Sequence, residues 1–211
     1  MATKTLKIED HWIASARQGN LDAFNNLVLA YQDQAYNQAY RMLGNPQAAE
    51  DAVQTAFLAA FQKIHQFRGE NFKAWLLRIV INLCYDELRR MKRQQNVPLE
   101  PLDNQGEEVE DPRWLADPAE PPEDAIERAE LNFLLQKALD AIPANLREVV
   151  TLVDIQDFKY DEAALISGVP IGTVKSRLAR GRAALSTYLK ASGFFENSRQ
   201  ATTRVRKLPQ V

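Results

Sequence analysis

The sequence predicts an all-α protein built from two small helical domains, and three observations support this fold class. Apolar residues recur at helical spacing through most of the 211 residues. An acidic, proline-rich stretch at residues 96–123 interrupts the pattern. Near the C-terminus two helical patterns meet at a tight turn in YDEAALISGVPIGTVKSRLARGR (Tyr160 to Arg182), with the spacing of a helix-turn-helix.

These observations divide the chain into four segments. We expect a helical domain over residues 1–95, a flexible linker over 96–123, and a second helical domain with the helix-turn-helix over 124–192. A polar, basic tail follows at 193–211 and is expected to be disordered. The linker holds six of the ten prolines of the chain among acidic residues, a composition that disfavours regular structure.

The apolar spacing predicts four helices in the first domain. They run from Ile8 to Ala16, from Asp22 to Leu43, from Gln47 to Ile64 and from Phe72 to Arg93. Each has an apolar face, so the four helices are expected to share a core.

Two further helices are expected in the second domain before the helix-turn-helix, the first from Glu123 to Ile142 and the second around Leu146 to Val153. They supply the core on which the helix-turn-helix packs. Its last helix is expected from Ile171 to Leu189, with Val174, Leu178 and Gly181 on the packed face.

Charge is distributed unevenly along the chain, although the formal net charge is only -2. Residues 1–95 hold 12 Lys and Arg against 9 Asp and Glu, and residues 131–211 hold 12 against 7. Residues 96–130 hold only 2 against 12. Two basic segments therefore flank an acidic one, and this pattern favours a nucleic-acid partner more than the net charge suggests.

The helix expected at 72–93 carries an aromatic and basic stripe opposite its core face. Steps of three and four residues place five side chains there: Trp75, Arg78, Asn82, Tyr85 and Arg89. Rings that stack on bases, cations that bind phosphates and an amide that reads base edges suit a single strand of nucleic acid. Packing of the rings against a neighbouring helix is the alternative interpretation.

The last helix presents a short, polar and cationic surface, as a helix that enters a major groove must. The residues expected to contact duplex DNA are Thr173, Lys175, Ser176, Arg177 and Arg180. A solvated pair of helices is the alternative, but spacing, turn and charge all favour DNA binding.

A third candidate surface lies on the helix expected at 47–64. Asp51, Gln54 and Leu58 lie opposite its apolar face. An exposed leucine beside a carboxylate and an amide indicates a protein-docking patch, although single exposed leucines are also common.

Motifs for catalysis and cofactor binding are lacking. Cys84 is the only cysteine and is expected to be a buried, inert thiol, while His11 and His65 lack the spacing of metal ligands. No catalytic residue, metal site, cofactor or small-molecule substrate is expected. No apolar run approaches the roughly 20 residues that span a bilayer, and the N-terminus lacks a signal core, so we expect a cytoplasmic protein without membrane insertion.

Taken together, these segments resemble the extracytoplasmic-function (ECF) sigma factors of bacterial RNA polymerase, over roughly Asn20 to Leu189. The motifs that carry the resemblance are AAEDAVQTAFLAAFQKIHQFRG (48–69), FKAWLLRIVIN (72–82), IPANLREVVTL (142–152) and GTVKSRLARGRAAL (172–185). Their order, with an acidic linker between two helical units, is typical of this minimal class.

The resemblance implies roles in the first domain, which is similar to sigma region two. Asp51, Gln54 and Leu58 would grip the clamp helices of the largest subunit of core RNA polymerase. Phe67 and Asn82 match the family's pocket for a base flipped out of the minus-ten element. Arg68 lies in the matching specificity loop, and the stripe from Trp75 to Arg89 would follow the melted non-template strand.

The second domain is similar to sigma region four, and its last helix would read the minus-thirty-five element as duplex DNA. The acidic linker resembles the segment that threads toward the polymerase active-site and RNA-exit channels. The family commonly has an anti-sigma partner, which can hold such a protein at the membrane.

Two other functions remain as alternatives. One is a stand-alone helix-turn-helix regulator whose N-terminal domain senses a ligand or dimerises; it would bind neither single-stranded minus-ten DNA nor core polymerase. The other is a helical adaptor that binds only proteins, in which Arg177→Ala with Arg180→Ala would leave function unchanged.

Overall fold

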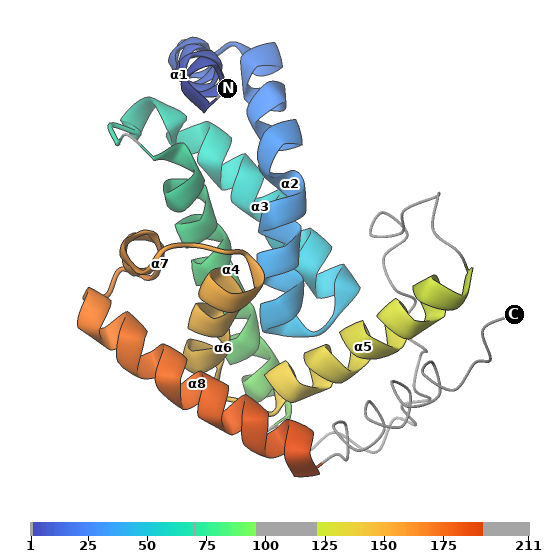
Figure 1. Cartoon of the computed structure of the whole chain (residues 1–211). Helices are drawn as coiled ribbons and strands as arrows, with labels where there is room; N and C mark the ends of the chain where they lie inside the picture. Colours follow the sequence, from blue (N-terminus) through green and yellow to red (C-terminus); the bar gives the residue numbers. More distant parts are fainter. Residues whose placement is uncertain (1, 70, 96–121, 192–211) are drawn as a thin grey trace, which may run out of the picture.

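The computed structural model of the chain describes residues 2–69, 71–95 and 122–191, and every regular element in these ranges is helical. The all-α prediction is therefore confirmed. The helices form two groups, called here the N-terminal unit (α1–α4) and the C-terminal unit (α5–α8) (Figure 1). The acidic segment 96–121 and the tail 193–211 lie outside the described residues, so the expectations about them stay predictions.

The N-terminal unit contains α1 (Ala2–Arg17), α2 (Leu21–Leu43), α3 (Pro46–Lys63) and α4 (Phe72–Gln95). A 3-10 turn, η1 (Ile64–Gln66), follows α3. The first helix begins at Ala2, six residues before the start predicted at Ile8.

Asparagine side chains begin three of these helices. Asn20, Asn45 and Asn71 each accept a hydrogen bond from the backbone N–H three residues later, at 2.8–3.0 Å. Gly44 ends α2 in the left-handed region, with φ 70°, and thereby turns the chain into α3.

Apolar side chains from all four helices fill the core of this unit. The fourth helix contributes its predicted core residues Phe72, Leu76 and Val80, together with Leu77 and Cys84. Burial raises the pKa of the Cys84 thiol to about 12, as the inert role predicted for it requires. The face of α4 opposite this core carries the predicted stripe of Trp75, Arg78, Asn82, Tyr85 and Arg89.

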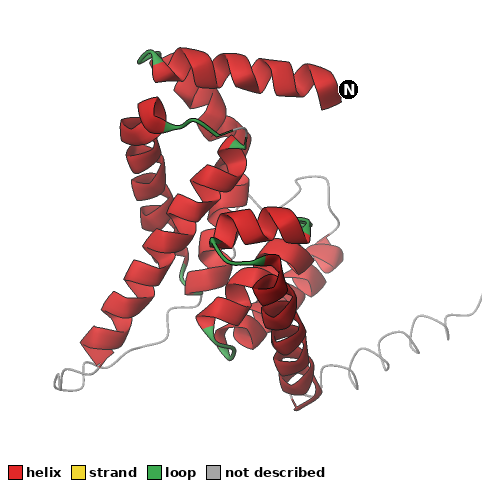
Figure 2. Cartoon of the chain, turned by 90° about the vertical axis from the view of Figure 1, so that its left-hand side faces the viewer, coloured by secondary structure: helices red, strands yellow, loops and turns green. Residues whose placement is uncertain are grey.

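The C-terminal unit contains α5 (Pro122–Asp140), α6 (Ala144–Val150), the π-helical turn η3 (Thr151–Ile155), α7 (Tyr160–Ser167) and α8 (Ile171–Ala191). The left-handed Gly168, with φ 65°, ends α7 and starts the turn that places α8 across it. Figure 2 shows the chain after a turn of 90° about the vertical axis, with the helices in red and the short loops between them in green.

The two units pack against each other, with α7 and α6 lying along α4 and α2 (Figure 1). Buried polar groups lie where they meet. Arg147 of α6 donates to the carbonyl of Met42 at 2.5 Å, and Arg41 of α2 donates to Asn132 at 2.9 Å. The sequence did not predict this contact between the units.

A substitution at Gly181 tests how α8 sits on α6. A Cβ added to Gly181 would lie 2.6 Å from Cγ2 of the buried Val150. Gly181→Ala is therefore expected to lower the free energy of unfolding by about 1–3 kcal/mol through overpacking. Gly172 is the matched control on the same helix, because nothing lies within 4 Å of its added Cβ.

Gly172→Ala is expected to raise the free energy of unfolding by up to about 1 kcal/mol, because alanine favours the helix. Urea unfolding followed by circular dichroism measures both variants. Equal stability of the two variants would contradict the close packing of α8 on α6.

Candidate nucleic-acid and polymerase interfaces

Two aromatic rings, Phe67 and Trp75, line a cavity at the N-terminal end of α4, and the buried Phe72 packs against both. Phe67 is only 6% exposed; its ring centroid lies 5.7 Å from that of Phe72 and 5.2 Å from that of Trp75. The cavity in front of them has a volume of about 470 Å³, and Arg68, Asn71 and Arg78 also line it. The rings and cations around this hollow suit the stacking and charge that a flipped base requires. Asn82, which was expected to share the pocket with Phe67, does not line it.

The C-terminal unit closes one side of this cavity. Leu165 of α7 lines it, although 54% of that residue remains exposed. The Arg78 guanidinium lies against the end of α7, since a Cβ placed on Gly168 would be 2.9 Å from its Nη2. A cation at a helix C-terminus is electrostatically favourable.

Farther along α4, Tyr85 is tied to the C-terminal unit. Its hydroxyl donates a hydrogen bond to Oε2 of Glu148, a residue that is only 2% exposed. Burial raises the pKa of Tyr85, the charge and hydrogen bond of Glu148 raise it further, and nearby Arg177 opposes them. Tyr85, the second aromatic residue of the stripe predicted on α4, is thus held by a hydrogen bond within the protein.

The other two residues of the stripe are open to solvent, and so is Arg78. Asn82 is exposed, and Arg89 is exposed and paired with Asp86 one turn before it. Of the five predicted side chains, Trp75, Arg78 and Tyr85 lie beside the C-terminal unit. The alternative interpretation, that rings of the stripe pack against a neighbouring helix, therefore describes part of this structure.

On α8 the predicted duplex-reading residues divide into two groups. Lys175, Ser176 and Arg180 are exposed, whereas Thr173 and Arg177 are half-buried. The Ser176 hydroxyl donates to the Thr173 carbonyl at 3.0 Å, along the helix. Burial of Val174, Leu178 and Gly181 fixes the opposite face, so the exposed group points to solvent.

Arg182 on the same helix has another partner. Its guanidinium donates to both carboxylate oxygens of Asp154, at 3.0 and 2.5 Å, and holds α8 to η3. This bidentate pair raises the pKa of Arg182.

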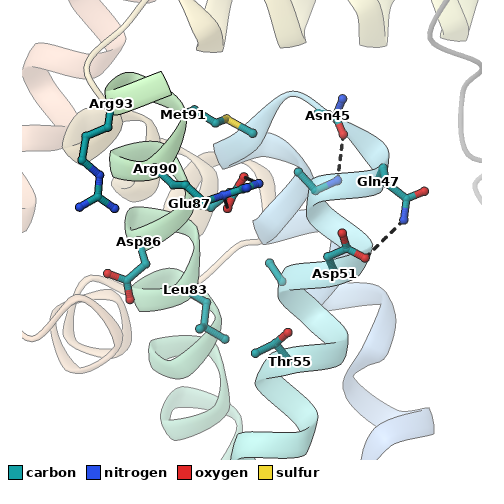
Figure 3. Close-up of a pocket in the computed structure, with 12 residues that line it drawn as sticks. Asn45, Gln47, Asp51, Thr55, Leu83, Asp86, Glu87, Arg90, Met91 and Arg93 are labelled. Atoms are coloured by element: carbon teal, nitrogen blue, oxygen red, sulfur yellow. Dashed lines mark hydrogen bonds and ion pairs between the residues drawn. The ribbon is translucent and has the colours of Figure 1, made fainter. Parts of the chain in front are cut away.

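The predicted polymerase patch forms a ridge on α3. Asp51, Gln54 and Leu58 are all exposed, and Leu58 is 65% exposed. A hollow of about 740 Å³ between α3 and α4 lies on one side, where Figure 3 shows Asp51 and Thr55 facing Leu83 and Arg90. A second hollow of about 290 Å³, lined by Gln54 and Tyr36, lies on the other side. The ridge between two hollows suits insertion into the surface of a partner protein.

Features of other classes of protein are absent from the described part of the chain. No group of three or more His, Cys, Asp or Glu side chains gathers there as a metal site would need. None of the described helices combines the length and the apolar character needed to cross a membrane.

Comparison with known proteins identifies the family. Residues 27–94 match the family model Sigma-70 region 2, and residues 132–185 match Sigma-70, region 4. The chain is 36% identical to the ECF RNA polymerase sigma factor SigW of Bacillus subtilis, over 84% of this chain and 95% of that protein. It is also 36% identical to SigE of Mycolicibacterium smegmatis, over 83% of this chain but only 65% of that protein.

Two solved structures are similar to this chain in fold and sequence. CnrH in complex with the cytosolic domain of CnrY has a TM-score of 0.60 and 28% identity, covering 87% of this chain and 98% of CnrH. RpoE in complex with the anti-sigma factor NepR from Bartonella quintana has a TM-score of 0.58 and 28% identity, covering 81% of this chain and 98% of RpoE.

Two helical units, one with a helix-turn-helix and one with an aromatic cavity, thus define a sigma-type transcription factor. The chain belongs to the ECF family of RNA polymerase sigma factors, as the sequence resemblance predicted. It is an alternative sigma factor for promoter recognition and transcription initiation.

The structure also presents residues that the sequence did not single out. Leu165 lines the cavity, and Glu148 and Arg147 join the units through hydrogen bonds. In the sequence, Arg147 and Glu148 stand within an ordinary amphipathic run, so no local signal separates them from solvated charges. The roles of the predicted site residues stay predictions.

Proposed function

We propose that the two units divide promoter recognition between them. The N-terminal unit binds core polymerase and the melted minus-ten strand, and the C-terminal unit reads the minus-thirty-five element as duplex DNA. The observation that carries this proposal is the cavity of Phe67 and Trp75, with arginine and amide groups on its rim. Its chemistry suits an extruded base, which a reader of duplex DNA alone does not need.

The proposed path of the strand starts at this cavity and follows α4. Arg68 and Arg78 supply positive charge beside the rings, and the exposed Asn82 supplies an amide one turn further on. Tyr85 and Arg89 extend the same face toward the end of the helix. Stacking and charge contribute affinity along this path, and the amide contributes base selectivity.

The ridge of Asp51, Gln54 and Leu58 is the proposed contact with core polymerase. Its exposure and the hollows on both sides support this assignment. On α8 the proposed duplex contacts are Thr173, Lys175, Ser176, Arg177 and Arg180, of which the three exposed ones are free to contact DNA in this arrangement.

An anti-sigma factor is the proposed regulator of this chain. The structural relatives CnrH and RpoE support it, because both were captured with a bound partner. The protein acts in the cytoplasm, where RNA polymerase and the chromosome are, and an anti-sigma factor can hold it at the membrane. It positions DNA for the polymerase and carries out no catalytic step of its own.

Leu58→Ala tests the polymerase contact. If this side chain enters a hollow of the partner, its loss should weaken binding to core polymerase by about 1–2 kcal/mol. Leu29→Ala is the matched control, because Leu29 on α2 is 66% exposed and Leu58 is 65% exposed. Competition for fluorescently labelled core polymerase measures both variants. Equal affinities of the two variants would remove Leu58 from the contact.

Arg180→Ala tests the duplex contact. Loss of this exposed cation should weaken binding to minus-thirty-five duplex DNA by about 1–3 kcal/mol if it reads a base edge. If it contacts only a phosphate, the slope of log affinity against log salt concentration should become shallower by about 1. Arg182→Ala removes the same charge from a side chain that Asp154 already engages, and it should have the smaller effect.

Holoenzyme binding to the duplex across a salt series measures both variants. A larger loss for Arg182→Ala than for Arg180→Ala would overturn the assigned face of α8.

Asn82→Ala tests the single-strand path. Start-site mapping with core polymerase and this chain first defines the minus-ten sequence. The substitution should then reduce discrimination between that sequence and single-base changes by about 1–3 kcal/mol. Asn25→Ala, at an exposed position of α2, should leave discrimination at the wild-type value. Unchanged discrimination in Asn82→Ala would remove this amide from base reading.

A further inference from the structure

A second, smaller hollow lies beside the base cavity. It has a volume of about 220 Å³ and is lined on one side by Phe67, Arg68 and Gly69, which also line the base cavity. The side chain of Phe67 is buried, and a Cβ added to Gly69 would lie 3.2 Å from Cε2 of its ring, so the loop lies directly against the ring. The loop therefore separates two hollows, and the proposed flipped base occupies only one of them.

The other wall of the smaller hollow is α1, which precedes the part of the chain that matches Sigma-70 region 2. Steps of three, one and three residues place four side chains of α1 on one helical face toward the hollow: Asp10, Ile13, Ala14 and Arg17. The helix is fixed in place, because Ala16 is buried and Trp12 packs against the core. This wall is therefore as well ordered as the loop opposite it.

The side chains around the smaller hollow suit a nucleobase. Arg17 and Arg68 supply an exposed cation from each wall, and neither has an ion-pair partner among the described side chains. Asp10 adds a carboxylate, which repels a phosphate but accepts hydrogen bonds from the N–H groups of a base. Ile13 and Ala14 supply an apolar surface for the flat face of a ring. A hollow for phosphate alone would be better without the carboxylate.

Guanine matches these groups better than the other three bases. Its Watson–Crick edge carries two neighbouring N–H donors, on N1 and N2, which can bind both oxygens of one carboxylate. The O6 acceptor beside them can bind an arginine. Adenine, cytosine and thymine each offer a carboxylate only one donor group. A carboxylate and two arginines around one hollow therefore favour guanine.

The path proposed for the melted strand gives the position of this base. From the base cavity the path follows α4 toward the C-terminal unit, which is proposed to bind the upstream minus-thirty-five element. None of the described residues of α4 lines the smaller hollow. A strand therefore reaches this hollow on the other side of the loop, with the next base toward the start site.

We propose that the smaller hollow is a second base subsite, in which Asp10, Arg17 and Arg68 bind a guanine immediately downstream of the flipped base. The inference rests on the proposed use of the base cavity. Through this subsite α1 extends base reading by one position beyond the flipped base.

Binding of core polymerase with the full chain to promoter DNA with a single-stranded minus-ten region tests the subsite. 2-Aminopurine at successive positions identifies the flipped base, because its fluorescence rises when it leaves the stack. The next position downstream then receives either guanine or hypoxanthine, which lacks only the amino group on N2. The wild-type chain should bind the guanine strand about tenfold more tightly, the equilibrium value of one hydrogen bond to a charged group.

Three variants of α1 remove parts of the subsite. Asp10→Ala removes the carboxylate and should make the affinities for guanine and hypoxanthine equal. Arg17→Ala should reduce the preference for guanine over adenine, which has an amino group in place of O6. Ala14→Leu fills the hollow at an exposed position without a change of charge, and it should weaken binding of the guanine strand. Asp22→Ala, which removes the same charge as Asp10→Ala from an exposed position of α2, is the matched control and should keep the wild-type preference.

Equal binding of the guanine and hypoxanthine strands by the wild type would overturn the inference, and so would a preference that persists in Asp10→Ala. A loss of affinity in Arg17→Ala that is the same for every base would indicate a phosphate contact and would overturn it too. Failure of the proposed function gives a different result. In that case 2-aminopurine would show no gain of fluorescence at any position, and the second subsite would fall with the first.

Discussion

The structure depends on the two faces of α4. One face supplies Phe72, Leu76 and Val80 to the apolar core and fixes the helix in place. The other carries Trp75 and Tyr85, rings too large to leave in water without loss of hydrophobic stabilisation. In the described structure Trp75 packs against Phe67 and Phe72, and Tyr85 is bonded to Glu148 of the C-terminal unit.

Polar contacts join the C-terminal unit to α2 and α4. Glu148 accepts a hydrogen bond from Tyr85 of α4, and Arg147 donates one to the Met42 carbonyl of α2. Arg147 also pairs with Asp140 of its own unit, at 3.0 Å. A buried hydrogen-bonding group that loses its partner costs about 1–3 kcal/mol, so these bonds help to fix the orientation of the two units.

Local pattern was enough to predict the helices and their inner faces. Val174, Leu178 and Gly181 were expected inside from their spacing alone, and they are buried. The contact between Tyr85 and Glu148 was beyond such reasoning, because it joins residues 63 positions apart and each stands in an ordinary amphipathic helix. The position of Leu165 could not be predicted either. An apolar residue of a helix is expected in a core, but 54% of Leu165 is exposed and it lines the cavity. Periodicity predicts which face of a helix is buried, but not which partner buries it.

Arg177 lies between the two proposed DNA-binding surfaces. It belongs to the proposed duplex-reading group on α8, yet it is half-buried and close enough to Tyr85 to lower the pKa of that residue. Its charge therefore acts on the contact between Tyr85 and Glu148 as well as on the surface of α8.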